Sequence, residues 1–195
     1  LKLSRGLGDV YKRQCIFFDA DETLFHFDAF QGMKLMFSRF GVDFSEQDYS
    51  VYQEVNLPLW VDYQDGRITA AQLKHARFES WATKLETTTA ALNSAFLAAM
   101  ADICSLLPGA KELMESLKGK VNMGIITNGF TELQSIRLER TGMTDYFDHV
   151  IISEEVGVAK PDAEIFEHAH KLIGLPSKQR AVSYTHLTLP TTMLV

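Results

Sequence analysis

Short apolar segments recur along the chain, and their order restricts the fold more than any other feature of the sequence. Residues 15–18 (CIFF), 121–127 (VNMGIIT) and 149–153 (HVIIS) have the composition of buried strands, and residues 180–182 (RAV) look like the entry of a fourth. Segments with helical periodicity separate the last three. Strands that alternate with helices favour a parallel sheet covered by helices on both faces. We therefore predict an α/β fold with a Rossmann-like parallel sheet.

A long, almost entirely helical stretch lies between the first strand and the second. Its apolar residues recur at helical spacing, and Ser45 and Thr69 are suited to cap helices. We predict that residues 27–106 form a helical cap inserted into a core made of residues 15–26 and 107–182. The helices expected in the cap cover residues 27–40, 45–56, 69–85 and 90–103, and those expected in the core cover 109–119, 131–140 and 161–174.

The two ends differ from the body of the chain. Residues 1–14 carry four basic side chains against one acid, and residues 183–195 contain no Asp, Glu, Lys or Arg. We expect residues 1–14 to be a foreign arm and residues 183–195 a foreign tail, which would leave the core incomplete at its C-terminus. The alternative is an ordinary arm and tail of the same protein.

Composition excludes several function classes. The net charge of -6, from 19 basic and 25 acidic residues, argues against a nucleic-acid partner, because phosphate backbones require a basic face. The two cysteines have no metal-binding spacing and fit a reducing compartment. No apolar run reaches the ~18 residues of a membrane span. We expect a cytoplasmic protein with a small-molecule substrate, no membrane and an undetermined oligomeric state.

Two carboxylates follow the first predicted strand in the stretch IFFDADETLF, residues 16–25. In open parallel sheets, ligands bind beyond the carboxyl ends of the strands, which is where Asp19 and Asp21 would lie. Paired carboxylates can share Mg²⁺, one carboxylate can attack phosphorus, and another can transfer protons. The alternative is that both aspartates are ordinary turn or cap residues.

Two other strand ends carry polar groups. The stretch IITNG places Thr127, Asn128 and Gly129 after the second strand, where a hydroxyl and backbone N–H groups could hold phosphate oxygens. The stretch GVAKPD places Lys160 before a helix, where an ammonium could offset crowded negative charge. Taken singly, the first could be a plain turn and the second a solvated surface lysine.

These three motifs, in this order, resemble those of the haloacid dehalogenase superfamily. The resemblance implies that Asp19 is the nucleophile and a metal ligand, and that Asp21 is the general acid/base and binds Mg²⁺ through its carbonyl. It also implies that Thr127 binds the phosphoryl group and that Lys160 steadies the intermediate. Asp21 favours phosphate esters, because the dehalogenase branch lacks an acid there. The expected substrate-binding residues are Thr23, Asn128 and Gly129.

Within that superfamily, the chain resembles the bacterial pyrimidine 5'-nucleotidases over nearly all of residues 15–182. This resemblance implies a Mg²⁺-dependent phosphatase that hydrolyses nucleoside 5'-monophosphates such as dUMP and dTMP through an aspartyl phosphate. It also implies that the cap selects the nucleoside. The segments that carry the resemblance are FFDADETLF, NLPLWVDYQDG, RFESWA, IITNGFTELQSIRLERTG and VIISEEVGVAKP.

Aromatic residues in the cap are candidates for stacking on a base. The alternative is that they belong to the hydrophobic core, as aromatic residues at helical spacing commonly do. The candidates are Trp60, Tyr63, Phe78 and Trp81.

The sequence departs from the family after residue 182. The family carries an acidic Gly-Asp motif after its fourth strand, which lies beside the first, and residues 183–195 contain no carboxylate. We expect Mg²⁺ to bind weakly and this chain to have little or no activity. The alternative functions are a sugar-phosphate phosphatase or phosphomutase of the same superfamily, and a non-catalytic fragment.

Overall fold

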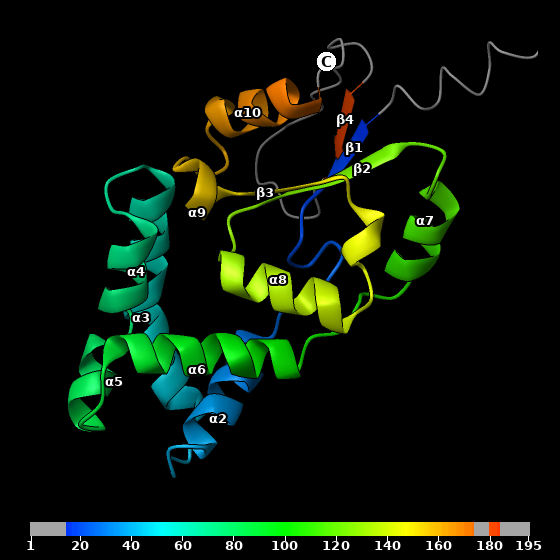
Figure 1. Ribbon diagram of the computed structural model, residues 1–195. Coiled ribbons are helices and arrows are strands. Elements are labelled where there is room, and N and C mark those ends of the chain that lie inside the picture. The colour runs from blue at the N-terminus through cyan, green and yellow to red at the C-terminus, as the bar shows by residue number, and fades with distance from the viewer. Residues whose placement is uncertain (1–14, 174–179, 184–195) are drawn as a thin grey trace, which may run out of the picture.

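The computed structural model describes residues 15–173 and 180–183, and a parallel sheet of four strands lies at its centre (Figure 1). The strands β1 (Cys15–Phe18), β2 (Asn122–Thr127), β3 (His149–Ile152) and β4 (Arg180–Ser183) have the order β3-β2-β1-β4. All three pairings are parallel, with β1 between β2 and β4. The predicted parallel α/β sheet is confirmed, and the fourth strand lies beside the first as expected.

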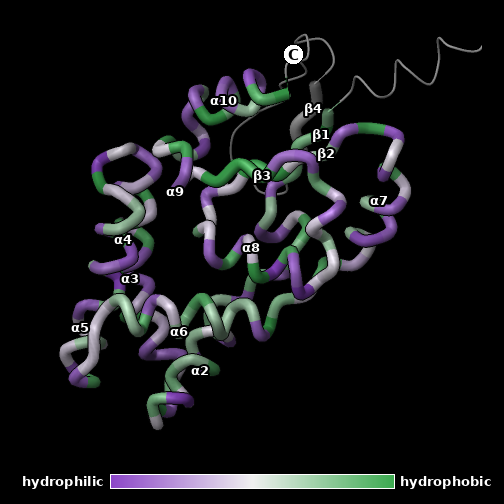
Figure 2. Tube along the Cα trace, in the orientation of Figure 1, coloured by the Kyte–Doolittle hydropathy of each residue, from purple (hydrophilic) through white to green (hydrophobic). Residues whose placement is uncertain are grey.

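Helices cover both faces of the sheet. Helices α7 (Ala110–Leu117) and α8 (Thr131–Arg140) supply side chains that pack with Phe18, whereas α10 (Ala163–Ile173) packs with Phe17. Successive strand residues point to opposite faces, so neighbouring phenylalanines serve two separate cores. In Figure 2, β3 is hydrophobic, whereas α10 mixes hydrophilic and hydrophobic residues.

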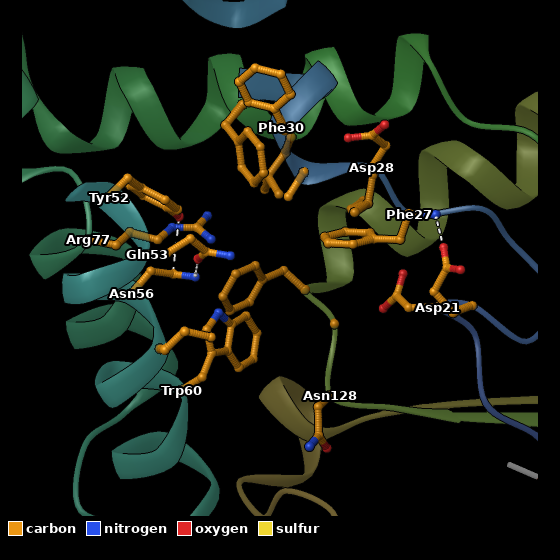
Figure 3. Close-up of a pocket in the computed structure, with 18 of the residues that line it drawn as sticks. Asp21, Phe27, Asp28, Phe30, Tyr52, Gln53, Asn56, Trp60, Arg77 and Asn128 are labelled. Carbon is orange, nitrogen blue, oxygen red and sulfur yellow. Dashed lines mark hydrogen bonds between the residues drawn. The ribbon is translucent and has the colours of Figure 1, made fainter. Parts of the chain in front are cut away.

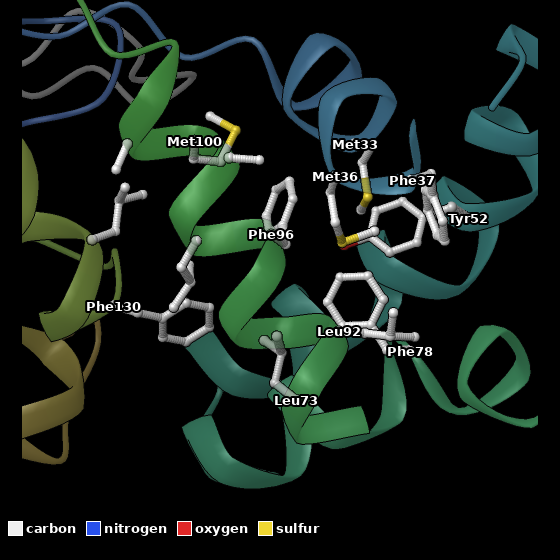
Figure 4. Packing of buried hydrophobic residues seen from close by; sticks show 14 of the residues in the cluster. Met33, Met36, Phe37, Tyr52, Leu73, Phe78, Leu92, Phe96, Met100 and Phe130 are labelled. Carbon is white, nitrogen blue, oxygen red and sulfur yellow. The ribbon is translucent and has the colours of Figure 1, made fainter. Parts of the chain in front are cut away.

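The helices of residues 29–102 gather at one end of the molecule (Figure 1), and we call them the helical cap. They enclose a core rich in phenylalanine and methionine, shown in Figure 4, to which Phe130 of the β2–α8 loop also belongs. The two segments that link the cap to the core lie side by side and are joined by hydrogen bonds. His26 N donates to Ser105 O, and Leu107 N donates to Leu24 O. The boundaries at 27 and 106 stay predictions. The cap contains α2 (Ala29–Ser38), α3 (Glu46–Gln64), α4 (Ala70–Ala76), α5 (Glu79–Lys84) and α6 (Thr89–Asp102).

The prediction that a helix ends near residue 56 was wrong, because α3 continues through Pro58 to Gln64. The buried residues Tyr52, Asn56 and Tyr63 lie before and after the proline, while Pro58 itself is exposed. A proline on the solvent side loses one helical hydrogen bond, and packing of the opposite face keeps the helix together.

The single helix predicted for residues 69–85 is two helices, α4 and α5. The chain turns at Arg77 and Phe78, whose exposed fractions are 5% and 0%. One continuous helix would have sent these adjacent side chains in different directions, so the break lets the protein bury both.

Two short helical elements were not predicted. The strand predicted for residues 149–153 ends at Ile152, because Ser153 begins α9 (Ser153–Val156). A 3-10 turn, η1 (Thr144–Tyr146), precedes β3.

The predictions for residues 1–14 and 184–195 lie outside the described residues. Ser183, predicted to begin the tail, pairs with Phe18 as the last residue of β4. Within the described part of the chain, no helix combines the length and the apolar character needed to cross a membrane.

Gly32 allows a close approach between α2 and α6. A Cβ at this position would lie 2.2 Å from Sδ of Met100 and 3.4 Å from the ring of Phe96. We expect Gly32→Ala to lower the free energy of unfolding by about 1–3 kcal/mol through overpacking. Urea unfolding measures this change, with exposed Gln31→Ala on the same helix as the control. A more stable Gly32→Ala protein would contradict this account of the packing.

Candidate active site

The carboxyl end of β1 places Asp19 next to a buried lysine. Oδ1 of Asp19 lies 2.7 Å from Nζ of Lys160, and the lysine side chain is 11% exposed. Lys160 Nζ also donates to the carbonyl of Ile126 in β2, at 2.9 Å. Parallel strand ends and the loop before α10 therefore bring together two of the predicted site residues.

Burial lowers the pKa of Lys160, and the charge of Asp19 acts in the opposite direction, with a smaller effect from Asp21. The ammonium thus depends on its carboxylate neighbours to stay charged in a poorly solvated position. A cation in this place can neutralise part of the charge that accumulates when an anion approaches Asp19.

One carboxylate oxygen of Asp19 takes the contacts described for this side chain. Both Lys160 and the Ala20 N–H contact Oδ1, the latter at 2.7 Å. Among the described residues, Oδ2 accepts no hydrogen bond. Oδ2 is therefore the oxygen that can act as a nucleophile or bind a cation.

Asn128 follows β2 as predicted, and its side chain contacts the loop that carries Lys160. Its side chain binds the backbone of Lys160 twice: Oδ1 accepts from Lys160 N at 2.7 Å, and Nδ2 donates to Lys160 O at 2.8 Å. Both functional groups of the amide are thus used to hold the lysine loop. Asn128 lines the cavity described below, but its hydrogen bonds position Lys160.

Thr127 and Gly129 form the turn after β2. Thr127 is fully buried, and its Oγ1 accepts from Gly129 N at 3.0 Å. A Cβ on Gly129 would lie 2.1 Å from Nε2 of Gln134, a fully buried glutamine on α8. The glycine is therefore required by the side chain packed beneath the loop.

Asp21 is held by an arginine that the sequence analysis missed. Nη1 of Arg137 lies 2.6 Å from Oδ1 of Asp21, and the two side chains are 2% and 31% exposed. Nε of Arg137 donates to Oε1 of Gln134 at 2.9 Å, and its guanidinium lies 4.5 Å from the ring centroid of Phe25. The arginine thus fixes one oxygen of the carboxylate.

Thr23 lies in the tight turn that follows Asp21. The turn is closed by hydrogen bonds from Leu24 N and Phe25 N to Ala20 O, both 3.0 Å, and Glu22 adopts a φ of 53°. Positive φ is rare for residues other than glycine and costs backbone energy. Thr23 does not line the neighbouring cavity.

A cavity of about 690 Å³ opens between the loop after β1 and the cap. Figure 3 shows Asp21 and Asn128 away from Tyr52, Asn56 and Arg77, which form its cap end. Aromatic rings line much of the remainder, namely Phe27, Phe30, Tyr49, Trp60, Phe96 and Phe130.

The four residues proposed to stack on a base differ in their position relative to the cavity. Trp60 lines it and stacks on Phe130, with ring centroids 5.4 Å apart. Phe78 is fully buried in the cap core, and Trp81 packs against Phe37 at 4.4 Å. Tyr63 points elsewhere, to Oγ of Ser153 at 2.8 Å. We conclude that only Trp60 of these four is placed to contact a ligand in this cavity.

The carboxylates fit a loosely held Mg²⁺. Asp19 and Asp21 offer hard oxygen atoms, and Mg²⁺ is commonly bound by one or two carboxylates together with water and phosphate oxygens. No group of three or more His, Cys, Asp or Glu side chains suited to a metal occurs within residues 15–173 and 180–183. The described donor set therefore needs water or substrate to complete six-fold coordination.

The pair of Asp21 and Arg137 provides a direct stability test. Asp21→Asn leaves a buried guanidinium without its counter-charge, so we expect the free energy of unfolding to fall by about 1–3 kcal/mol. A double-mutant cycle with Arg137→Met should give a coupling of about 1 kcal/mol or more. Urea unfolding of the metal-free protein measures both.

The exposed pair of Asp102 and Arg140 is the matched control, because both side chains are over a third exposed. Asp102→Asn should cost less than about 1 kcal/mol. Equal effects at Asp21 and Asp102 would mean that burial of Arg137 does not hold the loop.

The fold agrees with comparisons with known proteins. A family model described as haloacid dehalogenase-like hydrolase matches residues 14–182. The pyrimidine 5'-nucleotidase YjjG of Escherichia coli (strain K12) is 56% identical over 167 residues, which are 86% of this chain and 74% of the relative. The pyrimidine 5'-nucleotidase PynA of Streptococcus pneumoniae (strain ATCC BAA-255 / R6) is 30% identical over 172 residues, 86% of this chain and 73% of the relative.

Solved structures agree in fold. The HAD-hydrolase YfnB of Bacillus subtilis, determined with magnesium bound, superimposes with a TM-score of 0.76 at 22% identity, covering 88% of this chain and 79% of that one. The L-2-haloacid dehalogenase of Xanthobacter autotrophicus gives a TM-score of 0.64 at 19% identity, covering 87% and 68%. The chain belongs to the haloacid dehalogenase-like hydrolases.

Proposed function

We propose that the chain is a phosphatase for pyrimidine nucleoside 5'-monophosphates. The observation that carries the proposal is the contact between Asp19 and Lys160, at 2.7 Å, at a strand end next to an aromatic cavity. The 56% identity to a pyrimidine 5'-nucleotidase supports the substrate class. An aromatic cavity suits a flat base, whose faces can stack on rings, better than it suits a bare sugar.

Asp19 is the proposed nucleophile. Its Oδ2 attacks phosphorus, the bond from phosphorus to the ester oxygen breaks, and an aspartyl phosphate forms. Lys160 beside Oδ1 stabilises the negative charge that the phosphoryl group brings to the carboxylate. The Thr127 hydroxyl and nearby backbone N–H groups would hold phosphoryl oxygens.

Asp21 is the proposed general acid and base. It gives a proton to the departing 5'-oxygen, then takes one from the water that attacks the aspartyl phosphate, which releases inorganic phosphate and restores Asp19. Arg137 holds one oxygen of this carboxylate, so the other is directed toward the reacting group.

Mg²⁺ would be held by Asp19 and the Asp21 backbone carbonyl, and when bound it neutralises charge on the phosphate. We further propose that Mg²⁺ binds weakly and that turnover by this chain is slow. The reason is that the proposed metal site is described with the carboxylates of Asp19 and Asp21 alone. The rate of dUMP hydrolysis should keep rising with Mg²⁺ concentration after the rate of the Escherichia coli relative has saturated. A rate and Mg²⁺ dependence equal to those of the relative would contradict this proposal.

Labelled substrate tests the nucleophile even when turnover is slow. With 5'-³²P-labelled dUMP, we expect acid-denatured protein to retain a label that hydroxylamine releases. Asp19→Asn should abolish that label and lower hydrolysis on the order of 10³-fold or more. Asp145→Asn, at an exposed position, is the control and should behave like the wild type. Retained labelling in Asp19→Asn would refute the assignment.

A second substrate distinguishes a 5'-nucleotidase from a sugar-phosphate phosphatase. A 5'-nucleotidase should hydrolyse dUMP with a higher kcat/KM than 2-deoxyribose 5-phosphate, which lacks the base. Equal values would favour a sugar-phosphate phosphatase, and binding without any labelling or turnover would favour a non-catalytic fragment.

A further inference from the structure

Several rings that line the cavity keep part of their surface exposed, namely Phe27, Phe30, Tyr49 and Trp60. A partly exposed ring can offer a flat face to a ligand. Phe30 and Tyr49 pack against each other, with ring centroids 5.3 Å apart. Among the described ring contacts of these four residues, Trp60 alone pairs with a ring outside the cap helices, that of Phe130. Trp60 therefore combines access to the cavity with a contact to the loop after β2.

Phe130 lies three residues beyond the end of β2, and its ring has several neighbours in the cap. The residue is 3% exposed and belongs to the core of the cap, although its backbone lies in the loop between β2 and α8. Nζ of Lys74 lies 4.5 Å from its ring centroid, and Cζ of Arg77 lies 5.1 Å from it. Cations near a ring face are attracted to its partial negative charge. The ring that stacks on Trp60 is thus fixed within the same loop that carries Thr127.

The helix that carries Trp60 has a second anchor at the sheet. The indole meets the ring of Tyr63 edge-on, with centroids 5.8 Å apart, and the Tyr63 hydroxyl lies 2.8 Å from Oγ of Ser153. Ser153 is fully buried and follows β3 directly. Trp60 is therefore flanked by Tyr63 and Phe130, which connect it to the ends of two different strands. Because parallel strands end at one edge of the sheet, these contacts set the place of the indole relative to Asp19.

We propose that the pyrimidine base stacks on Trp60, and that Phe130 is a positioning residue that holds the indole in place relative to the carboxylate end of the cavity. The inference rests on the proposed function and adds the residue that contacts the base. In Figure 3, Trp60 lies on the cap side of the cavity and Asp21 on the other side. A nucleoside 5'-monophosphate can occupy both sides at once, whereas a sugar phosphate has no flat ring to offer to the indole.

Binding of 2'-deoxyuridine tests the stacking without phosphate, metal or turnover. The chain contains two tryptophans, and Trp81 packs on Phe37 in the cap core, so a Trp81→Phe protein reports on Trp60 alone. Deoxyuridine should quench the Trp60 emission saturably, whereas 2-deoxyribose, which lacks the base, should leave it unchanged. Binding that calorimetry detects without any change in Trp60 emission would overturn the proposal, and so would the absence of binding.

Calorimetry then compares two replacements of Trp60 in the protein that retains Trp81. Trp60→Leu removes the flat face and should weaken deoxyuridine binding about 10-fold, because stacking on an aromatic side chain contributes that much to the binding of a base. Trp60→Phe keeps a ring and should weaken binding about threefold or less. An unchanged affinity in Trp60→Leu, or equal losses in the two variants, would contradict stacking. The quenching measurement keeps the proposal testable if Trp60→Leu does not fold.

Phe130→Leu tests the positioning role in the Trp81→Phe background. Without its stacking partner the indole should move more freely, so the anisotropy of Trp60 emission should fall and the affinity for deoxyuridine should drop about threefold or more. Leu92→Ala is the control, because Leu92 is fully buried in the cap core and does not line the cavity. This control should lower stability and leave anisotropy and affinity unchanged. Equal losses of affinity in the two variants, or none in Phe130→Leu, would overturn the positioning role.

Failure of this inference is distinct from failure of the phosphatase chemistry. Labelling of the protein by dUMP, together with deoxyuridine binding that leaves Trp60 emission unchanged, would support the phosphatase and overturn the stacking. Saturable quenching in a protein that never acquires the label would support the stacking and contradict the proposed role of Asp19.

Discussion

Two buried cations constrain the loop that follows β1, and the arrangement of the site depends on them. Lys160 lies 2.7 Å from Asp19, and Arg137 lies 2.6 Å from Asp21. Moving either aspartate would take a carboxylate contact away from a poorly solvated cation, which costs several kcal/mol in buried pairs. The two cations come from opposite faces of the sheet, since α8 carries Arg137 and Lys160 precedes α10. The position of the loop therefore depends on packing in both layers.

The cap contains a third buried cation of a different kind. Arg77 has ring faces and neutral oxygens around it, whereas Lys160 and Arg137 each contact a carboxylate. A paired cation can fix an aspartate or help to receive a phosphoryl group. The two ends of the cavity therefore differ in charge pattern: the loop after β1 carries an aspartate paired with a cation, and the cap end carries a guanidinium among ring faces.

The sequence predicted the residues whose positions follow from topology. Asp19 and Thr127 stand where parallel strands end, and pairing of Phe18 with Ile125 brings those ends together. The sequence did not predict that Arg137 and Arg77 are buried, because a buried arginine gives a helix the same polar pattern as a solvated one. Only tertiary packing shows that Phe25 covers the first and three rings surround the second. Asn128 shows a further limit of prediction from sequence. Its amide binds the backbone of Lys160, which lies 32 residues further along the chain.

The loop between β2 and α8 connects the two ends of the cavity. Asn128 holds the backbone of Lys160, and two residues later the ring of Phe130 stacks on Trp60 and lies 5.1 Å from Arg77. Thr131 N then donates to Glu154, which also pairs with Lys74 of the cap. Within four consecutive residues, the chain thus contacts the backbone of Lys160, the aromatic wall and, through Glu154, the cap. Gly129 lies among these four residues on the buried Gln134, whose side chain would have to shift to admit a Cβ at this position. These contacts link the position of Phe130 beside Arg77 to that of the Lys160 backbone.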